Sequence, residues 1–375
     1  MKITSMKTFI VDVTQRGNWV FVRLNTDAGI TGIGEASQGG NDVHTLKALQ
    51  DIEPMVIGHN PFNIEAFHQC CYREDEGRPF HTAVSGIEHA FWDIVGKVLN
   101  TPVYNLLGGR CRDKIRLYAN INRATWDRSP SGFARNAKAA VLDGFTAIKC
   151  APFDAVSHGE LARTDGNSSE MRRVIDTGIE RIRQVRAAVG DEIDLLVDCH
   201  GRFTPSMAIQ VAKELEDVNL FWFEAPIPST DFEAIAKVKA EAPMPIAFGE
   251  NLRTKSLFQE ALEKQAMNIL MPDVKHTGGI LELKKISALA ESVKIPIAPH
   301  NPSGPVATAA SVQCMTSVPN FLILEHAWGE VPWRSELIIE PEKIEHGFIE
   351  ISDKPGLGIE LNDEVVGEHI LHSEV

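Results

Sequence analysis

IDLLVD, at residues 193–198, is the first of six short apolar runs that each end in an ionisable residue. The others are LFWFE (220–224), PIAFGE (245–250), MNILMPD (267–273), IPIAPH (295–300) and NFLILE (320–325). The terminal residues are Asp198, Glu224, Glu250, Asp273, His300 and Glu325, separated by 26, 26, 23, 27 and 25 positions. Such an interval is the length of one strand-plus-helix unit, so these residues are predicted to meet at one edge of a parallel sheet.

Two similar runs precede these six, RLYANI at 116–121 and FTAIKCA at 145–151. The stretches between the runs carry helical periodicity, for example MRRVIDTGIERIRQVRAAVG at 171–190. Eight strands with intervening helices predict a parallel α/β barrel of the TIM type. An open doubly wound sheet is the alternative, but no GxGxxG turn follows a first strand.

The two ends of the chain have a different pattern. Strand-like runs fill the first ~40 residues, with a hairpin turn predicted at 26–29. Helical patterns follow at roughly 44–57, 62–74 and 80–99. At the other end, PGLGIEL at 355–361 is predicted to form a strand or turn that packs back on the N-terminal layer.

Three of the strand-end carboxylates suggest a metal site. Asp198, Glu224 and Glu250 end neighbouring strands, and three carboxylates aimed at one point stay ionised together only when a cation lies among them. Oxygen ligands favour a hard divalent ion, so we expect Mg²⁺, with Mn²⁺ as the alternative.

Two histidines are candidates for proton transfer. His300 and Asp273 end adjacent strands, and a carboxylate there would orient the imidazole and raise its basicity. His200 follows Asp198 by two residues, so strand alternation predicts that both side chains point the same way.

Composition narrows the class of partner. Lys and Arg number 37 against 51 Asp and Glu, a net charge of −14, which argues against a nucleic-acid or anionic-membrane partner. The six cysteines form no CxxC pair and fit a reducing compartment. No apolar run is long enough for a signal peptide or a membrane span. We therefore expect a cytoplasmic, soluble protein. A small carboxylate substrate and a homo-oligomeric state are further expectations, which composition alone does not give.

Several motifs in order resemble one known family along the whole chain. They are DCHGR (198–202), FEAPIP (223–228), FGENL (248–252), PDVKHTGGI (272–280) and APHNPSGP (298–305). Together they resemble the enolase superfamily, and within it the mandelate-racemase subgroup with its acid-sugar dehydratases of the galactonate dehydratase type.

The resemblance implies a division into domains. Residues 1–113 would form an α+β capping domain that carries specificity loops. Residues 114–330 would form a modified TIM barrel of the (β/α)₇β type, and residues 331–375 would return to the capping domain.

It also implies roles for the strand-end residues. The Mg²⁺ ligands would be Asp198, Glu224 and Glu250. His300, with Asp273, would be the general base, and His200 would be the general acid. Glu325 would hydrogen-bond the substrate carboxylate. The implied reaction is dehydration of an aldonate or aldarate to a 2-keto-3-deoxy acid, through α-proton abstraction and an enediolate.

Departures from the family pattern leave alternatives open. Many relatives carry KxK at the end of the second barrel strand, but here the sequence is Lys149-Cys150-Ala151. This weakens the alternative of a racemase or epimerase, which needs proton exchange on both faces of one carbon. Lys149 could bind a substrate oxygen or a neighbouring carboxylate. Lys275 is an alternative base, because a related subgroup places a lysine near this position.

Loops near the mouth of the barrel are candidates for substrate recognition. Arg16, Asn18 and Trp19 are expected to contact a polyol chain, and Trp328 to wall the pocket. The polar segment at 157–169 is a candidate lid. Two other classes of protein have less support. A metal-dependent hydrolase would carry an HxH motif in the first barrel strand, and this chain has none there. A non-enzymatic binding protein would not retain an acid, a base and metal ligands together.

Overall fold

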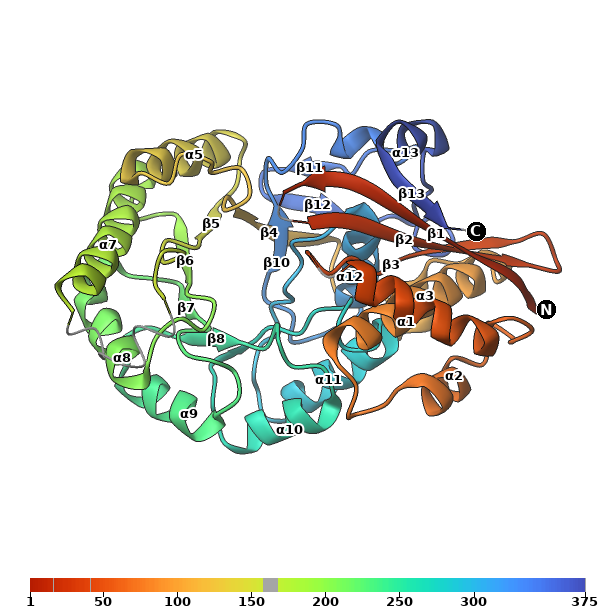
Figure 1. Cartoon of the computed structure of the whole chain (residues 1–375), viewed down its shortest axis with the longest axis horizontal. Helices are drawn as coiled ribbons and strands as arrows, with labels where there is room; N and C mark the ends of the chain where they lie inside the picture. Colours follow the sequence, from red (N-terminus) through yellow and green to blue (C-terminus); the bar gives the residue numbers. More distant parts are fainter. Residues whose placement is uncertain (16, 41, 158–167, 375) are drawn as a thin grey trace.

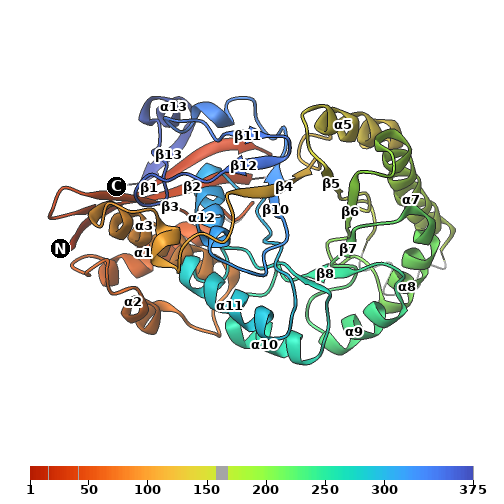
Figure 2. The same ribbon diagram turned by 180° about the vertical axis from the view of Figure 1, so that it is seen from behind.

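The computed structural model describes residues 1–15, 17–40, 42–157 and 168–374. Figure 1 shows a ring of helices around short strands on one side, and a curved sheet covered by helices on the other. The two chain ends lie together on the sheet side, as both views show (Figures 1 and 2). The arrangement confirms the predicted fold class, a barrel with an N-terminal α+β capping domain.

The capping domain is built on an antiparallel sheet in the order β13-β1-β2-β3. Its strands are β1 (Ile3–Thr14), β2 (Gly17–Thr26), β3 (Thr31–Glu35) and β13 (Ile370–Glu374). The turn between β2 and β3 lies where it was predicted, and Gly29 there has a φ of +75°. The helices are α1 (Asp42–Val56), α2 (Ile64–Cys71), α3 (Arg78–Val98) and α4 (Val103–Leu106).

Helix α3 packs unusually close to β3. A Cβ added at Gly34 would lie 1.8 Å from the carbonyl oxygen of Gly86, and one at Gly32 would lie 2.2 Å from that of Ala90. Only glycine allows this approach. The close contact fixes the middle of α3 against the sheet of the capping domain.

The barrel strands are parallel neighbours in sequence order. They are β4 (Lys114–Asn120), β5 (Ala147–Cys150), β6 (Asp194–Asp198), β7 (Trp222–Glu224), β8 (Ile246–Phe248), β9 (Ile269–Leu270) and β10 (Leu324–Ala327), and β10 pairs with β4. The run at 295–300 was expected to be a full strand. It instead makes isolated parallel bridges, from Ile297 to Leu270 and to Phe321, because the prolines at 296 and 299 cannot donate backbone hydrogen bonds.

Helices surround these strands (Figure 2). They are α5 (Pro130–Leu142), α7 (Ser169–Val189), α8 (Pro205–Glu214), α9 (Phe232–Glu241), α10 (Lys255–Glu263), α11 (Ile280–Ser292) and α12 (Pro305–Thr316). Ser129, Ser168, Thr204, Asp231 and Thr254 cap the first turns of α5, α7, α8, α9 and α10 with their side-chain oxygens.

The C-terminal tail crosses both parts of the molecule. A hairpin of β11 (Ile344–Glu345) and β12 (Phe348–Glu350) lies antiparallel against β4. The predicted segment at 355–361 forms a turn, in which the Leu357 amide donates to Asp93 of α3 at 2.9 Å. Helix α13 (Asp363–His369) then leads into β13, which pairs with β1.

The interior of the barrel is filled with side chains, so chemistry is confined to its ends. Tyr118 and Trp222 meet edge to face inside it, with ring centroids 5.4 Å apart. Small residues such as Ala147, Ala247 and Ala298 complete this inner cluster. None of the helices in the described part of the chain is long and apolar enough to span a membrane, and the six cysteines form no disulfide.

Candidate active site

A cavity of about 420 Å³ lies between the C-terminal ends of the barrel strands and the capping domain. The barrel contributes Asp198, His200, Glu250 and His300 to its lining, among other residues. The capping domain contributes residues 17–19 at the start of β2, residues 37–39 after β3, and Arg78 at the start of α3. Of the six strand-end residues predicted to meet, Asp198, Glu250 and His300 line this cavity.

Three of them form a carboxylate triad, made of Asp198, Glu224 and Glu250. One oxygen from each lies within 4.8 Å of the other two, and all three residues are buried. Burial, and then the neighbouring charge of Asp198, raise the pKa of Glu224 well above its usual value. Such crowding is unfavourable for the protein alone and fits a site for a divalent cation, because an ion among the oxygens would offset the repulsion.

Lys149, on β5, lies under the triad rather than in the cavity lining. Its Nζ is 3.0 Å from Glu224 Oε1, 2.9 Å from Glu325 Oε1 and 3.7 Å from Asp198 Oδ2, and its side chain is 1% exposed. Of the two alternatives for Lys149, this geometry supports contact with neighbouring carboxylates. Lys149 does not line the cavity, and its direct contact with a substrate oxygen stays a prediction.

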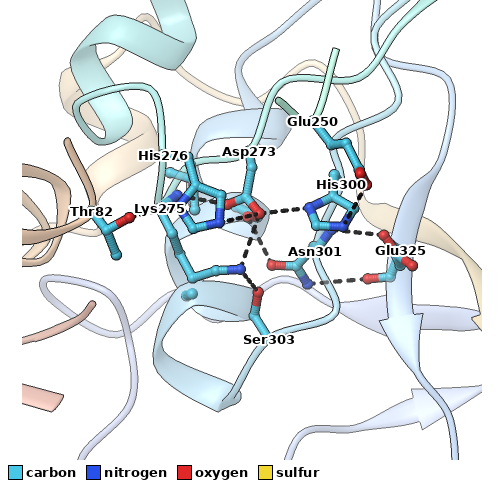
Figure 3. A network of polar contacts seen from close by, with 12 residues as sticks. Thr82, Glu250, Asp273, Lys275, His276, His300, Asn301, Ser303 and Glu325 are labelled. Carbon is cyan, nitrogen blue, oxygen red and sulfur yellow. Dashed lines mark hydrogen bonds and ion pairs between the residues drawn. The ribbon is translucent and has the colours of Figure 1, made fainter. Parts of the chain in front are cut away.

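His300 and Asp273 form the expected pair (Figure 3). The Nδ1 atom of His300 lies 2.7 Å from Asp273 Oδ2, and its Nε2 lies 3.0 Å from Glu250 Oε2. Burial alone would lower the pKa of His300, but Glu250, Glu325 and Asp273 raise it to about 9. One nitrogen is thus held by Asp273, while the other lies at the triad, where a substrate proton would be taken.

Asp273 has further partners, a lysine and a histidine, that strand spacing did not reveal. Lys275 places its Nζ 3.0 Å from Asp273 Oδ2 and also donates to Ser303. His276 has its Nε2 3.5 Å from the same oxygen, and its Nδ1 is 2.8 Å from the hydroxyl of Thr82 on α3. Burial would raise the pKa of Asp273, but His276, Lys275 and His300 hold it well below its usual value.

The motif PDVKHTGGI contains both residues, and the family resemblance indicates a role for Lys275 alone. A turn over residues 274–279 brings Lys275 and His276 back onto Asp273, and the sequence did not predict that turn. Because Lys275 is already bonded to Asp273 and Ser303, the geometry favours His300 over Lys275 as the base.

His200 lies in the cavity lining, on the other flank of the triad. Its Nε2 is 3.1 Å from Asp198 Oδ2, and its backbone amide donates to Asp198 Oδ1 at 2.9 Å. Strand alternation was the wrong reason for this placement, since β6 ends at Asp198 and His200 has a φ of +50°. A turn in the left-handed region, held by the Asp198 carboxylate, directs the imidazole.

Glu325, on β10, is fully buried and does not line the cavity. It accepts hydrogen bonds from Asn120 Nδ2 at 2.6 Å and from the backbone amide of Asn301 at 3.0 Å. It also forms an ion pair with Lys149. Burial would raise its pKa, but Lys149 and His300 lower it to about 2. Glu325 is therefore an ionised acceptor that supports its neighbours in this structure.

The predicted substrate contacts divide into three groups. Asn18 and Trp19 line the cavity, and Asn18 is held in place because its Nδ2 donates a hydrogen bond to Asp42 Oδ2 at 2.8 Å. Trp328 is not in the lining; its indole nitrogen donates to Asp143 at 2.8 Å, so its expected place at the pocket wall is corrected. Arg16 and most of the candidate lid, residues 158–167, lie outside the described residues.

Comparisons with known proteins agree with this geometry. Residues 4–108 match the mandelate racemase/muconate lactonizing enzyme N-terminal domain, and residues 132–365 match the enolase C-terminal domain-like family. A D-xylonate dehydratase of Haloferax volcanii is 35% identical, with 100% of this chain and 90% of the relative covered. A D-galactonate dehydratase of Verminephrobacter eiseniae is 34% identical, covering 98% and 94%.

A solved mandelate racemase/muconate lactonizing enzyme from Jannaschia sp. CCS1 superposes with a TM-score of 0.88 at 33% identity, covering 100% of this chain and 99% of that one. The matches to both domain families, the relatives aligned along nearly the whole chain and the shared fold all support the same assignment. The chain belongs to the enolase superfamily, in the group of mandelate racemase and muconate lactonizing enzymes.

Proposed function

We propose that this protein is a hydro-lyase that dehydrates a sugar acid to a 2-keto-3-deoxy acid with the help of Mg²⁺. The observation that carries the proposal is that two imidazoles contact two different carboxylates of one triad. His300 Nε2 lies 3.0 Å from Glu250, and His200 Nε2 lies 3.1 Å from Asp198. The two named relatives dehydrate sugar acids, which supports the same reaction class here.

Asp198, Glu224 and Glu250 would hold the metal ion. When bound, Mg²⁺ would supply positive charge next to the substrate carboxylate, where negative charge develops as the α-proton leaves. Mn²⁺ has similar oxygen ligands and is the alternative.

The side chains divide the proton transfers between them. His300 Nε2 takes the proton from the carbon next to the carboxylate, while Asp273 holds Nδ1 and stabilises the imidazolium. The electron pair of the broken C–H bond forms the enediolate. The bond from the next carbon to its hydroxyl then breaks, and His200 donates the proton that lets this oxygen leave as water. The remaining enol takes up a proton to give the 2-keto acid.

Dehydration has more support than racemisation because of the end of β5. The position after Cys150, where a second lysine would serve as a base on the opposite face, holds Ala151, whose methyl group transfers no proton. The test is a panel of aldonates and aldarates incubated with Mg²⁺ and followed by semicarbazide detection of 2-keto acids. We expect keto acid from at least one of them. Epimer formation without keto acid would support the racemase instead.

A further inference from the structure

Among the described residues, three arginines line the active-site cavity, and they differ in whether a carboxylate neutralises their charge. Arg123 is neutralised by an ion pair with buried Glu330. Arg78, at the start of α3, and Arg202, four residues after the end of β6, line the same cavity without an ion pair to any described residue. A half-buried guanidinium without a counter-charge is unfavourable unless a ligand supplies the anion.

Arg78 is connected to the carboxylate triad through one side chain. Its Nη1 donates to Asn251 Oδ1 at 3.2 Å, and Asn251 Nδ2 donates to Glu250 Oε1 at 3.2 Å. Its Nε is buried and has no hydrogen-bond partner in the described part of the chain. A short molecule with one end at the triad can therefore reach Arg78 with its other end. The Nε of Arg202 also lacks a partner in the described part of the chain, but its Nη1 donates to the carbonyl of Val156 at 2.9 Å, and no such chain of side chains joins it to the triad in the described residues.

We propose that the preferred substrate is a sugar diacid, and that Arg78 is the counter-ion of its second carboxylate. This inference rests on the proposed function. Arginine suits the task because its planar, permanently charged fork matches a carboxylate. A net charge of −14 would otherwise repel a dianion, so a local cation in the cavity wall has a clear purpose.

The experiment compares matched substrates, each aldonate with the aldarate of the same hydroxyl configuration, such as D-gluconate with D-glucarate and D-galactonate with galactarate. We expect wild-type kcat/KM to be higher for the diacid of the pair that is turned over. In Arg78→Met the ratio of diacid to monoacid kcat/KM should fall about ten- to a hundredfold, the range for lost charge-assisted hydrogen bonds. Arg78→Lys, which keeps the charge but not the fork, should retain part of that ratio.

Control variants separate the local contact from general effects. Arg73→Met removes the same charge from the exposed loop before α3, outside the cavity lining, and should leave the ratio unchanged. Calorimetric binding of the diacid to His300→Asn, with and without Arg78→Met, gives a readout independent of turnover and should show the same loss of affinity.

Each remaining outcome counts against the inference. An equal loss for both acids in Arg78→Met would make Arg78 a general polyol contact. Loss of the ratio in Arg202→Met but not in Arg78→Met would move the counter-ion to the other side of the cavity. Preference for 6-phosphogluconate over both acids would contradict a diacid. Turnover of monoacids alone refutes the inference but keeps the dehydratase, whereas no turnover of any acid refutes both.

Discussion

Asp273 is the residue on which the proton chemistry depends most. Its carboxylate contacts His300, Lys275 and His276, and it is fully buried. Replacing Asp273 would therefore leave a buried lysine ammonium without its partner, at a cost of about 3–5 kcal/mol for one broken buried pair. An Asp273→Asn variant would combine loss of stability with loss of the oriented base, so it is not a clean probe of catalysis.

His300→Asn tests the base without that complication. We expect the variant to fold, because the Asp273–Lys275 contact remains, and to lose exchange of the substrate α-proton with D₂O. The measurement is proton NMR of a bound sugar acid in D₂O at saturating Mg²⁺. Exchange at the wild-type rate would show that the base lies elsewhere, with Lys275 as the first suspect.

At the scale of elements, the helix α3 connects the capping domain to the turn after β9. His89 on this helix is buried and has its Nε2 3.3 Å from the Val274 carbonyl. Thr82 on the same helix contacts His276. The geometry of the His300–Asp273 pair therefore depends on how α3 packs, even though α3 itself contributes neither of the two proposed proton-transfer histidines.

His89 gives this packing a pH dependence with a definite sign. Burial lowers its pKa to about 4, whereas an unfolded histidine titrates near 6.5. Below pH 6.5 the unfolded chain binds a proton that the native state does not, so His89 makes the protein less stable as pH falls towards 4.

The test compares wild type with His89→Gln in urea unfolding at pH 7 and pH 5. The loss of unfolding free energy between these two pH values should be about 2 kcal/mol larger in wild type. Other titrating groups, including buried carboxylates, affect both proteins equally and cancel in the difference. Identical pH dependence in the two proteins would mean that His89 is protonated in the folded state.

Elements also show how far the sequence could predict the structure. The register of Asp198, Glu224 and Glu250 was predictable because a strand-plus-helix unit has a nearly constant length. The 295–300 run was predicted as a strand from its apolar residues, but its prolines restrict it to isolated bridges. Lys275 and His276 reach Asp273 through a turn, and Arg78 reaches the cavity through domain packing. Neither kind of contact leaves a periodic signal in the sequence.

At the scale of the whole molecule, the site requires both domains and, by our proposal, a metal ion. Glu224→Gln removes one negative charge from the triad and one partner from Lys149. We expect at least a tenfold weaker Mg²⁺ affinity by calorimetry, with activity falling in parallel and the circular dichroism spectrum unchanged. Wild-type activity that persists in excess chelator would contradict the metal assignment.

The central claim is that the two histidines have different tasks, one at the α-carbon and one at the leaving hydroxyl. The most direct test incubates wild type and His200→Asn with the same turned-over sugar acid and Mg²⁺ in D₂O, and follows both by proton NMR. We predict 2-keto-3-deoxy acid from wild type alone, and α-deuterated substrate without keto acid from His200→Asn, because His300 still exchanges the α-proton. Formation of the α-epimer by wild type without any keto acid would contradict the account.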